Sequence, residues 1–190
     1  MVDGVLARTG DWEWEAVSVG VPADVHGDRV TAEPVNLGTG WVGFDFADAF
    51  GKPTKVVNDA AMQAVGSYVG GRMLFLGLGT GLGSTMILDG VIAPMELGHL
   101  PFRSATFEDY VGERGLERLG KKKWRKAVLE TLDRLHRALG PEYVVLGGGN
   151  ADKLDEWPSY ARLGDNMNAF LGGFRLWDAP NRIASPALEL

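Results

Sequence analysis

The feature that most constrains this chain is a glycine-rich segment, residues 77–84 (GLGTGLGS), set between the apolar runs Met73–Leu78 and Thr85–Leu88. Both runs are typical of short buried strands. Alternating glycines remove side chains, so successive backbone N–H groups can converge on an anion, and Thr80 adds a hydroxyl donor. The segment predicts a strand–loop–strand phosphate clamp, with a glycine-rich hairpin that binds no ligand as the alternative.

Two better-known phosphate motifs are excluded at this position. A Walker A loop ends in Gly-Lys-Ser/Thr, and that sequence occurs nowhere in the chain. A Rossmann fingerprint needs its third glycine to open a helix, whereas Ser84 and a strand-like run follow here. A nucleotide-binding oxidoreductase is therefore disfavoured.

The rest of the chain alternates short apolar runs with helical patterns. Further strands are predicted at Ala16–Val21, Thr54–Val57, Val91–Ala93 and Tyr143–Leu146, with Asp89-Gly90 as a hairpin turn. Helices are predicted at Phe44–Phe50, at Ala60–Val69 and from Phe107 to Leu139 with a break allowed at Gly120. This alternation predicts an α/β fold, and the hairpin makes its sheet mixed.

Charge and composition narrow the function classes. The chain has 19 basic and 25 acidic residues, a net charge of −6, which disfavours general binding to nucleic acid or to an anionic membrane. The basic run Lys121–Lys126 could be a phosphate patch, but a solvated helix face with Trp124 turned to the core is the favoured interpretation.

Cysteine is absent, which excludes disulfides, Cys-ligated zinc and thiol catalysis and fits a reducing compartment. No apolar run reaches the ~18 residues of a membrane span, and the N-terminus lacks a signal-peptide pattern. We therefore expect a cytoplasmic protein.

Polar residues cluster at the ends of two predicted strands. Asn58 and Asp59 follow one strand and precede a helix. Asp59 is placed to cap that helix, and a carboxylate at this edge of the sheet can also accept a proton from a substrate hydroxyl, so both interpretations can hold. Glu96 and His99 follow the hairpin and suit hydrogen bonds to neighbouring hydroxyls of a sugar. Their spacing is not that of a metal site. A second glycine cluster, Gly147–Asn150, predicts a close approach of the main chain to a ligand.

In this order, these elements resemble the ROK family of sugar kinases, and within it the polyphosphate/ATP glucokinases. The resemblance extends from about Val17 to Trp177. The matching stretches are 36–43, 57–60, 78–83, 89–91, 96–102 and 146–150. The fold it implies is the actin-like ATPase (ribonuclease H-like) fold, with a mixed sheet and flanking helices.

The resemblance also implies roles for particular residues. Asp59 is expected to be the catalytic base that deprotonates the 6-hydroxyl of glucose or a similar hexose. The residues expected to hold the other sugar hydroxyls are Asn58, Glu96, His99 and Glu108. Those expected to contact the transferred phosphate are Gly79, Thr80, Gly81 and Gly83. Those expected near the phosphoryl donor are Gly147, Gly148, Gly149 and Asn150.

By the same resemblance the donor is ATP or polyphosphate with Mg²⁺, and the protein is a homodimer. Many ROK proteins carry a Cys-rich zinc motif after the Glu-x-Gly-His element. Thr106–Tyr110 occupies that region here without cysteine, so no zinc is expected.

One departure from the family matters most. The family opens with an Asp-x-Gly-Gly-Thr phosphate loop, which these residues do not contain. We therefore expect residues 1–57 to be the remnant of a truncated N-terminal lobe and residues 58–190 to form a C-terminal sugar- and phosphate-binding lobe. A fragment, a misassigned start and a natural truncation all fit, and the short chain is expected to show negligible glucokinase activity. The alternative function is a non-catalytic sugar-binding or regulatory ROK-type protein.

Overall fold

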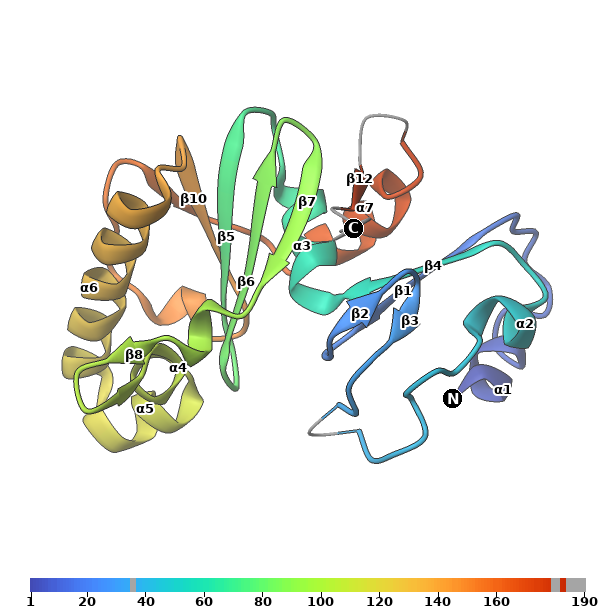
Figure 1. The fold of residues 1–190 in the computed structure, drawn as a ribbon, viewed down its shortest axis with the longest axis horizontal. Helices are drawn as coiled ribbons and strands as arrows, with labels where there is room; N and C mark the ends of the chain where they lie inside the picture. Colours follow the sequence, from blue (N-terminus) through green and yellow to red (C-terminus); the bar gives the residue numbers. More distant parts are fainter. Residues whose placement is uncertain (35–36, 179–181, 184–190) are drawn as a thin grey trace, which may run out of the picture. The chain divides into compact units, whose positions relative to one another are not determined.

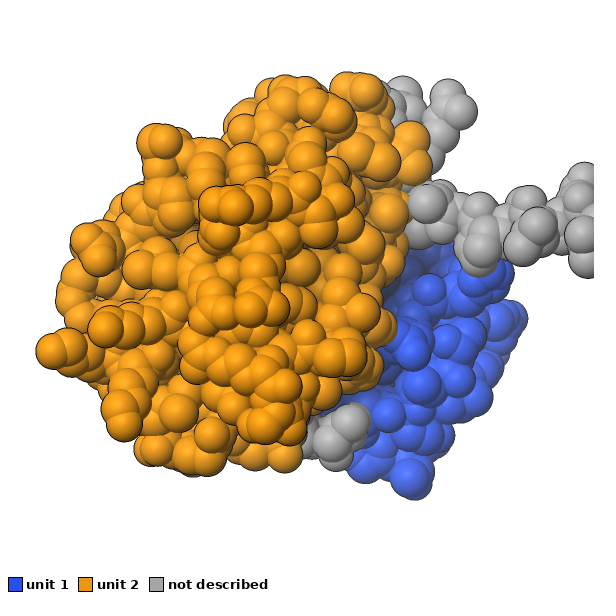
Figure 2. Space-filling model, turned by 60° about the vertical axis from the view of Figure 1, so that its left-hand side comes forward, with its two compact units in different colours: residues 1–59, 185–190 blue, residues 60–184 orange. Residues whose placement is uncertain are grey.

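The computed structural model describes residues 1–34, 37–178 and 182–183 (Figure 1). The chain divides into two compact units after Asp59, two residues beyond the boundary that the sequence suggested (Figure 2). Unit 1 has its described residues within 1–59, and unit 2 has them within 60–183. The roles expected of the two lobes stay predictions.

Unit 1 is built around two parallel strands. Its elements are α1 (Val2–Leu6), β1 (Val17–Val21), β2 (Val25–His26), β3 (Arg29–Val30), α2 (Phe46–Phe50) and β4 (Thr54–Asn58). In the parallel pair β1–β4, Val21 lies opposite Asn58, so Asn58 stands at the carboxyl end of this small sheet. Its buried core is Val21, Val30, Phe46, Phe50 and Val56.

Unit 2 contains a mixed sheet with strand order β11-β10-β5-β6-β7-β12 in the described part of the chain. The strands are β5 (Arg72–Leu78), β6 (Leu82–Leu88), β7 (Val91–Met95), β10 (Tyr143–Gly147), β11 (Ala161–Leu163) and β12 (Arg182–Ile183). β5, β6 and β7 form an antiparallel meander, and β10 runs parallel to β5. A small antiparallel pair, β8 (Pro101–Phe102) and β9 (Ala105–Thr106), follows the short helix η1 (Leu97–His99).

Helices cover both faces of this sheet. Leu74, Leu76 and Leu78 of β5 share one core with Trp124 and the other buried residues of the helices on that side. Those helices are α4 (Phe107–Val111), α5 (Glu113–Leu119) and α6 (Lys121–Leu139). The other face is covered by α3 (Asp59–Ser67), whose Gln63 lies with Phe75 at Gly147. The remaining helices are η2 (Ala151–Lys153) and α7 (Asn168–Arg175), which packs closely on α3.

The predicted helix from Phe107 to Leu139 is three helices. A break at Gly120 was expected, and a second break occurs at Gly112, where a Cβ would lie only 2.6 Å from the Thr80 carbonyl oxygen. The interpretation of Trp124 as a core residue is confirmed, because it is fully buried and donates from Nε1 to the Val111 carbonyl at 2.7 Å. Lys121–Lys123 are exposed.

The predicted strands form with small changes at their ends. β6 begins at Leu82, three residues before the predicted start, because Leu82 pairs with Leu78 and closes a tight hairpin. The sequence did not predict β2, β3, β8, β9, β11 or β12, since two or three residues are too few to show a period. None of the described helices is long and apolar enough to cross a membrane.

Candidate functional site

The glycine-rich segment forms the turn between β5 and β6. Gly77 lies opposite Gly83 in the antiparallel register, and the Gly79 N–H donates to the Gly81 carbonyl at 3.2 Å. Thr80 stands exposed at the tip. The strand–loop–strand arrangement expected of a phosphate clamp is therefore present, and phosphate binding itself stays a prediction.

The first residue of α5 holds this turn. The Glu113 N–H donates to the carbonyls of Gly79, at 3.0 Å, and Thr80, at 3.2 Å. In a planar trans peptide the N–H points opposite to the C=O, so the N–H groups of Thr80 and Gly81 are directed away from Glu113. Two adjacent N–H groups held in one direction suit an anion such as a phosphoryl oxygen.

The second glycine cluster leaves the sheet beside the first. Gly147, the last residue of β10, lies in register with Gly77 of the parallel strand β5. Gly148 has a φ of +82°, and a Cβ there would lie 2.5 Å from the Leu78 carbonyl oxygen, so this position requires glycine. The sheet thus brings both predicted phosphate-side loops to one edge.

Asn150 ties these two loops together. Its backbone N–H donates to Leu78 at 2.9 Å, and its Nδ2 donates to the Gly79 carbonyl at 3.2 Å. Its Oδ1 accepts from Lys153 Nζ at 2.5 Å, and the residue is only 6% exposed. The Asn150 side chain is thus bonded within the protein and holds the two glycine loops together, and its expected place near a phosphoryl donor stays a prediction.

Glu96 directly precedes the 3₁₀ turn η1, and His99 is the last residue of that turn. The distance between Glu96 Oε2 and His99 Nδ1 is 3.9 Å, and both side chains are more than half exposed, at 58% and 67%. Ser84 fixes the turn by donating to the Met95 carbonyl at 2.6 Å and accepting from the Leu97 N–H at 3.1 Å. Two polar side chains are thus presented to solvent on a rigid support.

Glu108 lies between this turn and the glycine hairpin. Its Oε2 is 2.6 Å from where a Cβ of Gly81 would stand, and its Cβ is 3.5 Å from the equivalent point at Gly98. A capping box between Thr106 and Asp109 starts the helix that carries it, and hydrogen bonds from Thr106 hold the pKa of the Asp109 carboxyl below its usual value. Unit 2 therefore brings Glu108 next to the predicted phosphate loop.

Asn58 and Asp59 stand where β4 ends and α3 begins. The Asn58 Nδ2 donates to the Ala23 carbonyl at 3.3 Å. Asp59 is the first residue of α3 and is exposed, and its roles as a helix cap and as a base both stay predictions. Ala60, the next residue, packs on the hairpin, since its Cβ is 2.9 Å from where a Cβ of Gly83 would stand. Convergence of Asn58 and Asp59 with Glu96, His99 and Glu108 stays a prediction.

The described residues do not form a metal site made by the protein alone. No group of three or more His, Asp or Glu side chains within them could hold a metal ion. Magnesium in phosphoryl-transfer sites commonly keeps several waters and is bound largely through the substrate phosphates. The described residues are compatible with Mg²⁺ that is carried in this way by the phosphates of a donor.

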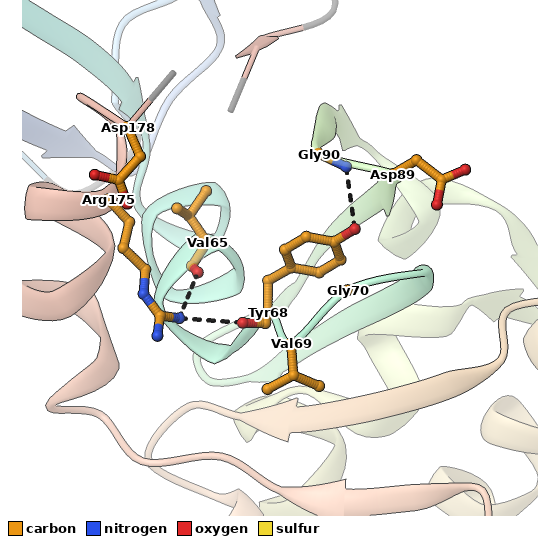
Figure 3. Close-up of a pocket in the computed structure, with 8 residues that line it drawn as sticks. All are labelled: Val65, Tyr68, Val69, Gly70, Asp89, Gly90, Arg175 and Asp178. Carbon is orange, nitrogen blue, oxygen red and sulfur yellow. Dashed lines mark hydrogen bonds between the residues drawn. The ribbon is translucent and has the colours of Figure 1, made fainter. Parts of the chain in front are cut away.

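A separate cavity of about 280 Å³ lies at the opposite end of β5 and β6 (Figure 3). Tyr68 crosses it, accepting from the Gly90 N–H at 3.0 Å and donating to Gly71 at 2.9 Å, and burial raises the pKa of its hydroxyl. Arg175 donates to the carbonyls of Gly66 and Tyr68 at the end of α3. Figure 3 shows Asp89 directed away from Tyr68. These polar contacts stabilise the junction of α3, α7 and the β6–β7 turn, and no predicted site residue lies there.

Sequence reasoning missed three positioning groups. Glu33 accepts hydrogen bonds from the N–H groups of Gly40 and Trp41, both at 3.0 Å. Gly40 and Trp41 belong to residues 36–43, one of the stretches that resemble the ROK family. Asn36, the first residue of that stretch, lies outside the described residues. These hydrogen bonds lower the pKa of the Glu33 carboxyl. Lys153 and the Glu113 N–H are the other two. Of these three groups, only Lys153 has a signal in the sequence, namely its position three residues after Asn150.

Comparison with curated proteins supports a likeness over much of the chain. No family model matches it. The polyphosphate glucokinase of Mycobacterium tuberculosis (strain ATCC 25177 / H37Ra) is 29% identical over 151 residues, which cover 70% of this chain and 55% of that protein. The chain thus spans about half the length of the curated relatives it matches.

Comparison with solved structures supports the fold. An inorganic polyphosphate/ATP-glucomannokinase from Arthrobacter sp. strain KM is 26% identical, with a TM-score of 0.72 over 90% of this chain and 76% of that one. A ROK family glucokinase from Streptomyces griseus, in complex with glucose and AMPPNP, is 18% identical, with a TM-score of 0.67 over 90% of this chain and 85% of that one. The expected α/β class, with a mixed sheet and flanking helices, is confirmed.

Proposed function

Because this chain is a relative of the ROK family sugar kinases and shares their actin-like ATPase fold, we propose that it binds glucose or a similar hexose for phosphoryl transfer to the 6-hydroxyl. The proposed donor is ATP or polyphosphate with Mg²⁺, which when bound neutralises charge on the phosphates. A homodimer and a cytoplasmic location belong to the same proposal.

One observation carries this proposal. The glycine hairpin, the Asn150 side chain bonded to it, Glu108 and Ala60 lie together at one edge of the unit 2 sheet. This neighbourhood supports the proposal that the hairpin contacts the phosphate and Glu108 contacts the sugar. Asp59 is joined to Ala60, so the proposed base is one residue from the helix turn that packs on this hairpin.

In the proposed mechanism each side chain has a defined task. The Asp59 carboxylate accepts the proton of the 6-hydroxyl as that oxygen attacks the phosphoryl group. Asn58, Glu96, His99 and Glu108 hydrogen-bond the other hydroxyls and fix the sugar's orientation. The Thr80 and Gly81 N–H groups donate to the transferred phosphoryl group where charge develops.

Glucose binding is the direct test. Calorimetry with glucose should give a dissociation constant in the roughly millimolar to micromolar range, and L-glucose should give no heat. His99→Ala is expected to weaken binding about tenfold, since one hydrogen bond contributes about 1–3 kcal/mol when its partner is lost. His26→Ala, at an exposed histidine in unit 1, is the control and should bind like the parent chain. No heat from the parent chain at saturating glucose would overturn the sugar site.

A non-catalytic sugar-binding protein is the second candidate, favoured by one observation. These residues contain no Asp-x-Gly-Gly-Thr sequence, and loss of a single charge-stabilising group commonly costs ~10²–10³ in rate. Glucose 6-phosphate formation with ATP or polyphosphate separates the two functions. In any form that turns over, Asp59→Asn should abolish the product and leave glucose binding largely intact; turnover that is indifferent to this change removes Asp59 from the base role.

A further inference from the structure

The basic run at the start of α6 has no part in the proposed site. Residues 113–126 contain seven Lys and Arg against two Glu, although the whole chain carries a net charge of −6. Lys121, Lys122, Lys123 and Lys126 are all exposed. Burial of Trp124 accounts for the helix face that turns inward, and it leaves this concentration of positive charge unexplained.

The placement of these lysines opposes ordinary helix electrostatics. The N-terminus of a helix carries partial positive charge, so cations there are unfavourable, and the first turn of α6 has no acidic residue to compensate. Within the described residues no ion pair involves Lys121, Lys122, Lys123 or Lys126, whereas Arg125, Arg134 and Arg137 of the same helix are each paired. Charges held against a local preference and left unpaired are a common mark of a binding surface.

The run continues from the glycine hairpin. Glu113 bonds the hairpin turn, and the seven residues of α5 then span about 10 Å before α6 begins (Figure 1). Arg114 and Arg118 lie four residues apart on one face of α5. Arg114 stands 4.0 Å from Glu108, which itself lies against Gly81. Positive side chains therefore lead from the predicted phosphate loop to the first turn of α6.

We propose that this basic track, defined as Arg114, Arg118, Lys121, Lys122, Lys123 and Lys126, binds a long inorganic polyphosphate chain whose end lies at the glycine hairpin. A linear polyanion with a charge on every repeat matches a series of flexible ammonium groups, which need no single geometry. The three phosphates of ATP, held at the hairpin, leave most of the track unused. Glu113 and Glu117 on α5 oppose the polyanion, which confines its path to the face of Arg114 and Arg118.

This inference rests on the proposed function for its donor class, and binding tests it without turnover. The parent chain is titrated with long-chain polyphosphate, tripolyphosphate, ATP and a single-stranded oligonucleotide of matched charge, at several salt concentrations. Lys122→Gln/Lys126→Gln removes two charges from the track. Arg72→Gln/Arg137→Gln removes two exposed charges elsewhere in unit 2 and is the matched control.

The expected result is that long-chain polyphosphate binds at least tenfold more tightly than tripolyphosphate. The track variant should lose about tenfold in long-chain affinity, and its salt slope should fall by roughly 2, about one for each phosphate contact removed. The control should bind like the parent, and the tripolyphosphate affinity of both variants should be unchanged.

Three results would overturn the inference. The first is an equal loss of long-chain polyphosphate affinity in the track variant and in the control. The second is equal affinity for long-chain polyphosphate and tripolyphosphate. The third is oligonucleotide binding as tight as polyphosphate binding, which would indicate an unselective polyanion surface. Glucose calorimetry on the same variants distinguishes failure of this inference from failure of the proposed function. If glucose binds normally but long-chain polyphosphate is not preferred, only the basic track is contradicted. Helix content and thermal midpoint should not fall in the track variant, since Lys122 lies in the first turn, where a cation opposes the helix dipole, and Lys126 is exposed.

Discussion

At the residue scale, Asn150 is a buried residue whose hydrogen bonds hold the loops of the candidate site in place. Its backbone N–H, its Nδ2 and its Oδ1 are all hydrogen-bonded, and the residue is only 6% exposed. Its partners are Leu78 and Gly79 of the hairpin and Lys153. A buried amide bonded in this way is costly to remove, because its partly buried partners lose their hydrogen bonds. Asn150 is therefore the residue whose loss should disturb the hairpin most.

Asn150→Ala is expected to destabilise the chain by about 1–3 kcal/mol, because it leaves Gly79 with one hydrogen bond fewer and Lys153 without its acceptor. Urea unfolding measures this free energy. Asp152→Ala, at an exposed neighbour in the same short helix, is the control and should stay within about 0.5 kcal/mol. Equal stability of parent and Asn150→Ala would show that the tie between the loops contributes nothing.

At the element scale, the short helices α4 and α5 connect Glu108, a proposed sugar ligand, with the glycine hairpin, the proposed phosphate loop. α4 carries Glu108, and the first N–H of α5 holds the hairpin turn. Helices of five to seven residues are not stable by themselves, so their caps and their packing decide whether they form. The Thr106–Asp109 capping box is the local contribution to that stability.

Thr106→Ala should cost about 0.5–2 kcal/mol, as loss of an N-cap hydroxyl usually does. Thermal unfolding followed by circular dichroism measures it. Thr106→Ser, which keeps a capping hydroxyl, is the control. If the sugar-side role of Glu108 is correct, Thr106→Ala should also weaken glucose binding, whereas Thr106→Ser should not.

Asp109 gives this cap a pH dependence. Its pKa is lower in the folded chain, so the carboxylate stabilises the fold above the unfolded-state pKa of about 4, and that contribution is lost as the pH falls through the folded value. The stability difference between the parent and Asp109→Asn should therefore be constant from neutral pH to about pH 5 and shrink at lower pH. Thermal midpoints measured across this range test the sign. A difference that grows on acidification would contradict it.

At the scale of the whole molecule, ligand binding is linked to folding. The side chains proposed to bind the sugar are Asn58, Asp59, Glu96, His99 and Glu108. A ligand that binds only the folded state raises stability by about 2.7 kcal/mol at a hundred times its dissociation constant. Glucose binding by all five residues should therefore appear as a stabilisation of the entire chain.

Saturating glucose is expected to raise the thermal midpoint of the parent chain, and the rise should be reduced in both Asn58→Ala and Glu96→Ala. Combining the two changes should cost less than the sum of the single effects, because both side chains would contact one ligand. Differential scanning calorimetry with L-glucose as the control measures this. Full additivity would argue for separate binding sites.

The sequence by itself determined the α/β class, the positions of the described strands of five or more residues, the largely helical character of residues 107–139, and the glycine segments where the main chain turns or is closely approached. These follow from local periodicity and from the backbone freedom of glycine, which a chain carries before it folds. Only the tertiary structure decided that Gly77 and Gly147 leave the sheet side by side, that Glu113 and Asn150 hold one hairpin, and that Glu108 lies against Gly81. Those contacts join residues far apart in the chain, and their partners are chosen by strand register and helix packing, which no local pattern encodes.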